Sequence, residues 1–474
     1  MLNIPEYKSA ERVFYYFEEI SKIPHGSYNT APIADYLEGF AKAHSLEYVR
    51  DDANNVIIKK RAFSGYESRP TVILQGHTDM VAEKVTGSTK DMETEGIEIY
   101  RDGDFLRARG TTLGGDDGVA VAYMLALLES DDIPHPSLEM LFTSDEEVGL
   151  LGADALDTSK LDGKLMINID SDDEGIFTVG CAGGARVDIS FDVSREACAL
   201  KAYKLSVANL LGGHSGVEID KGRANAIKLT AEVLASLKDV RLASLDGGTK
   251  DNAIPRECTA CFFAGEDIFT AFEEKKSEIL ARYKDTEPNA TFTLVECECE
   301  AAALDKESTE RTLSILNETR FGVIAMSRDI EGLVESSENL GIAHLTEYKM
   351  EFTVSVRSSK SDAKAELIST LKTLAKNHGA SVSVRGEYPA WEYKKDSHIR
   401  DVACRVFSDM YGKAAKVITI HAGLECGIFS NKIDGLDCIS LGPDNFDIHT
   451  TEEHLSISSF ARVWEFIKNV LREI

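Results

Sequence analysis

The stretch VILQGHTDMV, residues 72–81, runs from three consecutive apolar residues through Gly76 to a polar pair, His77 and Asp79. A short apolar run that ends at a glycine predicts a buried strand. Because side chains two positions apart on a strand point to the same face, His77 and Asp79 would lie side by side. That arrangement suits a metal-binding histidine whose ring is oriented by a neighbouring carboxylate.

A glycine-rich segment, RGTTLGGDDGVAVA (109–122), carries Asp116 and Asp117 directly ahead of an apolar helical pattern. A loop of this kind at a helix N-terminus can hold a phosphate group through its backbone N–H groups. Here the segment lacks the lysine and the serine or threonine of a phosphate-binding loop. The two carboxylates therefore favour a cation at this position.

Three later apolar strands are each followed by further candidate ligands. In chain order these are Asp145, Glu146 and Glu147, then Asp170, and near the C-terminus His449. Ligands bind at the carboxyl ends of the strands in an open α/β sheet. Because Glu146 and Glu147 are adjacent, they cannot both point the same way. One can bind a metal while the other faces the substrate as a base.

Five residues form the candidate set of metal ligands: His77, Asp116, Glu147, Asp170 and His449. Zinc sites with an open position use histidine and carboxylate ligands, and paired sites share a bridging carboxylate. Taken alone, Asp116 or Asp170 is more often a helix cap than a ligand. Five such residues in this order, at strand ends or in a glycine loop, favour a two-metal hydrolase.

The chain resembles the co-catalytic dizinc metallopeptidases related to carboxypeptidase G and succinyl-diaminopimelate desuccinylase. Within them it is most similar to the aminoacylhistidine dipeptidases, also called Xaa-His dipeptidases or peptidase D. The matching stretches are IPHGSYNT (23–30), LQGHTDMV (74–81), GTTLGGDDGVAVA (110–122), SDEEVGLLGA (144–153), NIDSDDEG (168–175), GGHSGVEIDKGRANAIK (212–228), NAIPRE (252–257), TVSVRSS (353–359) and IHAGLECGIF (420–429). They extend from near Ile23 towards the C-terminus, so the resemblance covers nearly the whole chain. One departure is Asp117, where close relatives are expected to carry asparagine.

The resemblance implies a division of the ligands between two zinc ions. Asp116 would bridge the ions, His77 and Asp170 would complete one, and Glu147 and His449 the other. It also implies a cis peptide bond directly after Asp116. The same ligands accept manganese or cobalt, so the metal stays open. Asp117 would add a carboxylate beside the metals, which would shift their affinity without abolishing it.

The resemblance implies catalytic roles for three further residues. Glu146 would be the general base acting on a metal-bridged water. Asp79 would orient the ring of His77. His214 would stabilise the tetrahedral oxyanion, although the residue alone suggests a loop histidine. Substrate-binding residues would be Arg357, which suits a carboxylate, together with Asn252, Glu425 and Gly427.

Composition limits the class of protein. The chain has 474 residues, 43% of them hydrophobic, and a formal net charge of −28. Such an acidic balance argues against nucleic acid and anionic membranes as partners. We find no apolar run long enough to span a bilayer and no secretory signal at the N-terminus. Nine cysteines without a framework spacing suit a reducing compartment. We therefore expect a cytoplasmic enzyme.

The order of elements predicts an α/β fold in two domains. We expect a dizinc exopeptidase-like, mixed but mostly parallel sheet flanked by helices, with an inserted α+β lid domain. The catalytic domain would comprise residues 1–183 and 388–474, and the lid residues 184–387. Insertion is required because His449 must return to the same site as His77. We expect the lid to close over the substrate during the reaction.

Three functions are compatible with these features. The first is a dipeptidase that prefers Xaa-His substrates such as carnosine. The second is the same chemistry on another dipeptide, a tripeptide or an acyl-amino acid. The third is a non-enzymatic relative, which would have lost the base or a ligand, whereas this chain retains Glu146 and all five ligands. We expect a small peptide as substrate and a homodimer as the assembly. Whether His214 acts in its own chain or across a dimer stays open.

Overall fold

The computed structural model describes residues 4–265, 268–299, 301–328, 330 and 332–474. The chain forms two compact units. The first comprises Met1–Cys181, Tyr393–Thr419 and Leu424–Ile474, and the second comprises Ala182–Glu392 and Ile420–Gly423. Within the described residues no helix is both long and apolar enough to cross a membrane.

The first unit is built on an eight-stranded sheet in the order β1-β2-β6-β3-β7-β23-β8-β22. Its strands are β1 (Glu47–Arg50), β2 (Val56–Lys60), β3 (Val72–His77), β6 (Leu138–Thr143), β7 (Leu165–Asn168), β8 (Ile176–Cys181), β22 (Lys416–Ile420) and β23 (Asp437–Ser440). The four central strands, β6, β3, β7 and β23, are parallel. Towards the edges the pairs β1–β2, β2–β6 and β23–β8 are antiparallel. The predicted mixed α/β sheet is therefore confirmed, with parallel pairing among its four central strands.

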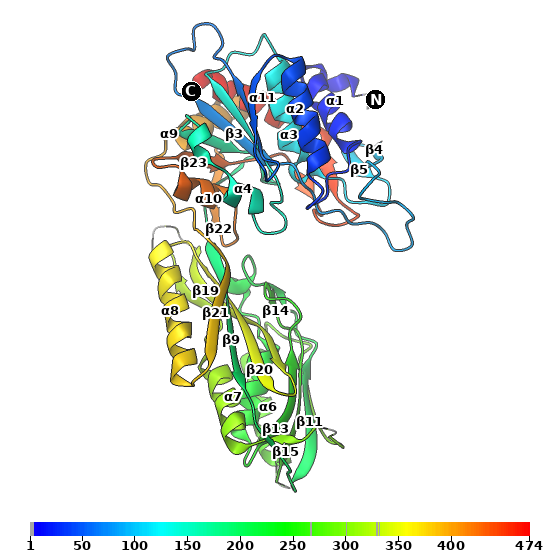
Figure 1. The fold of residues 1–474 in the computed structure, drawn as a ribbon, viewed down its shortest axis with the longest axis vertical. Helices are drawn as coiled ribbons and strands as arrows, with labels where there is room; N and C mark the ends of the chain where they lie inside the picture. Colours follow the sequence, from blue (N-terminus) through cyan, green and yellow to red (C-terminus); the bar gives the residue numbers. More distant parts are fainter. Residues whose placement is uncertain (1–3, 266–267, 300, 329, 331) are drawn as a thin grey trace. The chain divides into compact units, whose positions relative to one another are not determined.

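Helices cover both faces of this sheet (Figure 1). They are α1 (Glu11–Ser21), α2 (Ala31–Ala43), α3 (Gly115–Glu129), α4 (Leu151–Ala155), α9 (His398–Tyr411), α10 (Glu425–Lys432) and α11 (Ile457–Glu473). The α1, α2, α3, α9 and α11 helices share one hydrophobic core with the sheet, whereas α10 contacts α4, β8 and β23. Phe460 of α11 packs against Phe14, Phe17 and Tyr123 in that core. The C-terminal helix is thereby tied to the first and third helices.

The first unit also carries a small four-stranded sheet in the order β24-β25-β5-β4. Its strands are β4 (Ile99–Asp102), β5 (Phe105–Ala108), β24 (Asn445–Phe446) and β25 (His454–Ser456). The antiparallel pairing of β25 with β5 joins the C-terminal part of the chain to a segment near residue 100. This pairing anchors the loop that carries His449.

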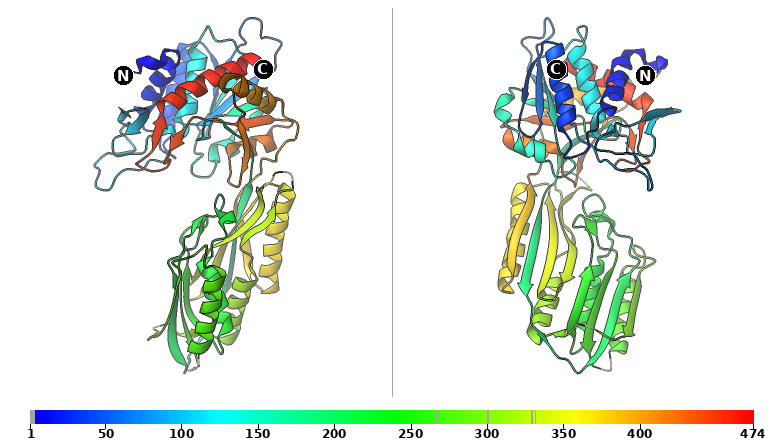
Figure 2. Two further views of the ribbon diagram at one scale, coloured as in Figure 1. Left: turned by 180° about the vertical axis from the view of Figure 1, so that it is seen from behind. Right: turned by 45° about the vertical axis from the view of Figure 1, so that its right-hand side comes forward.

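The second unit is a nine-stranded antiparallel sheet with helices on one face (Figures 1 and 2). Its strands are β9 (Gly183–Asp192), β11 (Lys201–Ala208), β13 (Arg241–Gly247), β15 (Cys258–Ala264), β16 (Thr291–Glu296), β18 (Gly322–Met326), β19 (Val334–Leu345), β20 (Lys349–Ser358) and β21 (Ser381–Tyr388). Its helices are α5 (Ala226–Ser236), α6 (Phe269–Arg282), α7 (Lys306–Glu318) and α8 (Ser361–Asn377). Alternating residues of the strands supply a core separate from that of the first unit. That this unit acts as a lid stays a prediction.

Short paired segments complete the second unit. They are β10 (Arg195–Glu196) with β17 (Ala303–Leu304), and β12 (Gly213–His214) with β14 (Ala253–Ile254). The second pair joins the GGHSG stretch to the NAIPRE stretch, since His214 lies opposite Ala253.

Candidate metal centre

Three of the parallel strands in the first unit deliver polar residues to the same edge of the sheet. Strand β3 ends at His77, β6 ends three residues before Glu146, and β7 ends two residues before Asp170. Because the carboxyl ends of parallel strands meet at one edge, these side chains converge although they are far apart in sequence.

A glycine on β3 lets the N-terminal turn of α3 reach this edge. A Cβ atom on Gly76 would lie 2.3 Å from both Ala120 Cβ and Asp117 Oδ2, so no larger residue fits. With glycine there, the backbone N–H of His77 donates to Asp117 Oδ2 at 3.1 Å. Asp117 therefore faces the strand backbone. The Asp116–Asp117 peptide bond is cis, as predicted.

The two oxygens of Asp116 face two different histidines. Oδ1 lies 2.9 Å from His77 Nε2, and Oδ2 lies 3.0 Å from His449 Nε2. Asp170 approaches the first histidine, with Oδ1 3.8 Å from His77 Nε2. Glu147 approaches the second, with Oε1 2.8 Å from His449 Nε2. All five predicted ligands therefore gather around one carboxylate.

These contacts form two groups of three residues that share Asp116. One comprises His77, Asp116 and Asp170, and the other comprises Asp116, Glu147 and His449. In each group the potential ligand atoms lie within 4.8 Å of one another. Imidazole nitrogen and carboxylate oxygen are the donors that divalent zinc, manganese and cobalt accept.

The cluster holds more carboxylates than positively charged side chains. In the described part of the chain, the ion pairs of its carboxylates are with histidines, and no lysine or arginine takes part. Burial raises the pKa of Asp170 well above its ordinary value. Contacts with Asp116 and Glu147 raise the pKa of His449 to about 10. Although burial acts in the opposite direction, contacts with His449 and His77 hold the pKa of Asp116 below its ordinary value.

The residues present therefore fit two divalent cations, one in each group. Glu147 Oε1 is buried and faces the ring nitrogen of His449, which suits two atoms that bind the same metal. A carboxylate shared between the groups, with one oxygen turned to each, is the arrangement that a bridging ligand needs.

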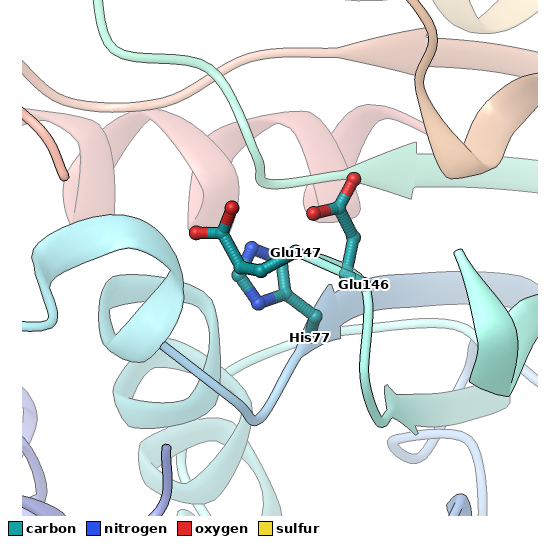
Figure 3. A group of neighbouring side chains, drawn as sticks. All are labelled: His77, Glu146 and Glu147. Carbon is teal, nitrogen blue, oxygen red and sulfur yellow. The ribbon is translucent and has the colours of Figure 1, made fainter. Parts of the chain in front are cut away.

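Glu146 belongs to a third group, with His77 and Glu147. Figure 3 shows the two glutamates extending from one loop beside the imidazole of His77. Burial, the largest cause, raises the pKa of Glu146 to about 8, and the charges of Glu425 and Glu147 add to the effect. Only Glu147 of the two glutamates pairs with His449. The geometry is compatible with Glu147 as ligand and Glu146 as base.

Asp79 makes more contacts than the sequence indicates. His77 Nδ1 lies 2.9 Å from the backbone carbonyl of Asp79 and 3.5 Å from its carboxylate. The carboxylate accepts hydrogen bonds from the backbone N–H of Glu146 at 2.9 Å and of Glu147 at 3.4 Å. It also accepts one from the hydroxyl of Ser27 at 2.8 Å. Asp79 thus orients the loop of both glutamates as well as the ring of His77.

Glu425 lies beneath this edge and is fully buried, at the first turn of α10. Gln75 Nε2 and Thr143 Oγ1 donate to its Oε2 at 2.5 and 2.7 Å, whereas Oε1 has no hydrogen-bond partner among the described residues. Burial raises the pKa of Glu425 to about 7. Gly427 is buried in the same helix. The contacts of Glu425 are with the protein, and its substrate-binding role stays a prediction.

The remaining predicted residues lie in the second unit. The carbonyl of Asn252 accepts the N–H of Ser215, so Asn252 adjoins the loop of His214. Arg357 is buried on β20, where its Nη1 donates to the hydroxyl of Tyr388 at 2.9 Å, and in the described part of the chain its Nε has no hydrogen-bond partner. Burial, and after it the charge of Arg357, lower the pKa of His214.

Sequence reasoning missed two residues near Arg357. His421 is buried, and its Nε2 lies 2.7 Å from the hydroxyl of Ser337. Burial and the charge of Arg357 lower the pKa of His421 to about 3, so the ring is neutral. Tyr388 packs so closely on Gly184 and Gly423 that a Cβ at either would come within 2.7 Å of it. Neither residue stands in a pattern that marks it in the sequence, although His421 opens the HAGLECGIF stretch.

Comparisons with known proteins place the chain in a family. Residues 73–473 match the model of peptidase family M20/M25/M40. The cytosol non-specific dipeptidase of Escherichia coli (strain K12) is 35% identical over 467 residues, which cover 97% of this chain and 96% of that protein. The chain belongs to this peptidase family and is a metallopeptidase.

Solved structures agree with this assignment. The aminoacylhistidine dipeptidase from Vibrio alginolyticus is 33% identical, with a TM-score of 0.92, and the match covers 98% of this chain and 97% of that one. The aminopeptidase PepT from Bacillus cereus, 18% identical with a TM-score of 0.57 and 98% of both chains covered, shares the fold. The resemblance deduced from the sequence motifs is therefore confirmed at the level of the family.

Removing one histidine tests the two-group arrangement. We expect His449→Ala to lower the metal content from two equivalents to one, because His77, Asp116 and Asp170 still form a complete group. Elemental analysis of the dialysed protein measures this content. The side chain of His449 is 45% exposed, so its removal should leave the fold intact. His454→Ala, in the same segment, should keep both ions. A His449→Ala protein that retains two ions would show that His449 is not a ligand.

Proposed function

We propose that the protein hydrolyses dipeptides and prefers Xaa-His substrates, of which β-alanyl-histidine is an example. The observation that carries the proposal is the shared carboxylate of Asp116, which faces a histidine on each side, with Glu146 beside one of these histidines, His77. The preference for a C-terminal histidine is supported by the name of the Vibrio alginolyticus protein, aminoacylhistidine dipeptidase. The Escherichia coli relative is named a non-specific dipeptidase, so the preference needs its own test.

Two zinc ions are the proposed cofactors, with manganese or cobalt as alternatives. His77 and Asp170 would hold one ion, Glu147 and His449 the other, and Asp116 both. Such ions polarise a carbonyl group and lower the pKa of water from about 15.7 to roughly 7. The histidines must be neutral to act as ligands, so binding of the ions releases the protons that the cluster retains without them.

Glu146 is the proposed general base. It takes a proton from the attacking water and passes it to the leaving amine of the dipeptide. A base is most effective when its pKa lies near the working pH, and a buried carboxyl group meets that condition better than an exposed one. The hydrogen bond from the backbone N–H of Glu146 to Asp79 fixes the backbone position from which the Glu146 side chain projects.

Residues outside the metal cluster would bind the rest of the substrate. His214 would donate a hydrogen bond to the oxyanion that forms in the transition state. Arg357 would bind the C-terminal carboxylate of the dipeptide, because its guanidinium can form two parallel hydrogen bonds with it. Asn252, Glu425 and Gly427 would line the substrate pocket.

We also propose a cytoplasmic location and a homodimer. The location is supported by the word cytosol in the name of the Escherichia coli relative.

A substrate panel with and without a chelator tests the proposed function. We expect chelator-sensitive turnover of dipeptides. The kcat/KM should be higher for an Xaa-His dipeptide than for dipeptides with the same first residue and a different second residue. Acyl-amino acids and tripeptides serve as competing substrates. Higher kcat/KM on those compounds would favour the alternative, the same chemistry on another amide. Unchanged turnover after complete metal removal would overturn the metal-dependent mechanism.

Glu146→Gln tests the base. We expect turnover to fall by about 10²–10⁴-fold, the usual contribution of proton transfer. Both metal ions should stay bound, because Glu146 is not assigned as a ligand. Turnover and metal content should be measured on the same sample, with Asp154→Asn, an exposed acid of α4, as the control. Loss of metal together with activity would reverse the roles of Glu146 and Glu147.

His214→Ala tests the oxyanion donor. A group that contacts charge present only in the transition state lowers kcat far more than it raises KM when it is removed. We expect kcat to fall by about 10²–10³-fold, with unchanged metal content. His344→Ala, a half-exposed histidine of the same unit, is the matched control. A nearly normal kcat with both ions bound would remove His214 from the mechanism.

A further inference from the structure

The glycine-rich loop before α3 directs four consecutive backbone N–H groups at one carboxylate, that of Glu453. Leu113 and Gly114 donate to its Oε2 at 2.7 and 3.0 Å. Gly115 and Asp116 donate to its Oε1 at 2.8 and 3.4 Å. Successive N–H groups that converge in this way form a concave anion-binding site, of the kind that holds phosphate in other proteins. In this chain the anion is one of its own side chains.

The loop is shaped for this contact. Gly114 has a φ of 72°, in the left-handed region, and a Cβ atom there would lie 2.9 Å from Met80 Sδ. A Cβ atom on Gly115 would lie 2.8 Å from the side-chain amide of Asn445. Glycine at both positions lets the loop close against its neighbours and turn its N–H groups inward. The glycines that resemble a phosphate loop in the sequence therefore serve an internal carboxylate.

Burying Glu453 is costly, which makes its position informative. The residue is 3% exposed, and in the described part of the chain its carboxylate bonds to backbone N–H groups and the amide of Asn445, with no lysine or arginine among its partners. Burial raises its pKa. A buried carboxylate is tolerated only when hydrogen bonds replace its water, and here backbone N–H groups at the start of α3 do so. An apolar residue would avoid this cost but could not hold the loop.

What the loop holds is Asp116, the carboxylate shared by the two metal groups. Asp116 is itself the last of the four residues whose backbone N–H groups bond to Glu453. The segment that carries Glu453 also carries His449, which faces Asp116 Oδ2 at 3.0 Å. One stretch of chain therefore supplies a ligand to one group and fixes the backbone of the ligand common to both.

We propose that Glu453 is a positioning residue for the metal centre. Its carboxylate holds the loop so that Asp116 turns one oxygen to His77 and the other to His449 before any ion binds. The inference rests on the proposed function, since it assumes that Asp116 bridges two ions. Without the anchor, the loop would place Asp116 in several positions, and each ion would bind more weakly.

The test is the zinc affinity of Glu453→Gln, measured on the full-length protein by competition with a chromogenic chelator. Glutamine keeps the size of the side chain but offers one acceptor oxygen and no charge, so two of the N–H groups lose their partner. We expect affinity for zinc to fall by about 10–100-fold, the usual effect of removing a group that orients a metal ligand. Wild-type affinity in the folded variant would overturn the proposal.

A matched control separates positioning from general stability. Glu139 is 2% exposed, lies on β6 of the same unit, and accepts N–H groups of Asp162 at 3.1 and 3.0 Å and of Gly163 at 3.0 Å. Glu139→Gln removes a buried carboxylate acceptor near the start of the strand, whereas the metal ligands follow its end. We expect it to lower the melting temperature of the metal-free protein and leave zinc affinity unchanged. An equal loss of zinc affinity in this control would also overturn the proposal.

A second variant covers the case in which Glu453→Gln does not fold. Gly115→Ala keeps the carboxylate but adds a methyl group against Asn445, which moves the loop away from Glu453. It should weaken zinc binding in the same direction, and unchanged affinity would overturn the proposal. The wild-type protein distinguishes the two levels of inference. If it binds fewer than two zinc ions, the proposed function fails. If it binds two and the variants bind them equally well, only the role of Glu453 fails.

Discussion

Like-charged side chains gathered at one edge of a sheet are the constraint around which the first unit is organised. Asp116, Glu146, Glu147 and Asp170 lie together with two histidines, and none of the ion pairs among the described residues brings a lysine or arginine to them. Such a cluster is unfavourable unless protons or cations neutralise it. The parallel strands impose the proximity, because their carboxyl ends meet at one edge. A pair of divalent cations would relieve this repulsion, and the same cations would serve catalysis.

Rigid backbone contacts hold these acids in place. Asp79 accepts the N–H groups of Glu146 and Glu147, and Asp117 accepts that of His77. Glu453 accepts those of the loop that leads to Asp116. In each case a buried carboxylate fixes the main chain from which a candidate ligand or base projects. Binding sites are effective when their groups are held in position beforehand, and here backbone hydrogen bonds to acids provide that rigidity.

The second unit contributes a different chemistry. Arg357 bonds to the half-buried Tyr388, and the buried pair of Ser337 and His421 lies near its charge, with the ring of His421 neutral. Positive charge in this unit contrasts with the negative charge of the cluster in the first unit. Family membership makes the protein a metallopeptidase. The names of its relatives differ on specificity.

Local patterns in the sequence were enough to identify the α/β class, the strands that precede His77, Glu146 and Asp170, and the residue types of a metal site. They succeed because hydrophobic periodicity and glycine punctuation are local properties of the chain. They could not reveal that β2 and β8 pair antiparallel with the central parallel strands, that Asp79 binds two backbone N–H groups, or that the glycine loop closes on Glu453. Those contacts join residues separated by tens to hundreds of positions, and no local pattern marks their partners. Pairing of distant segments depends on packing of the whole chain, which tertiary structure alone specifies.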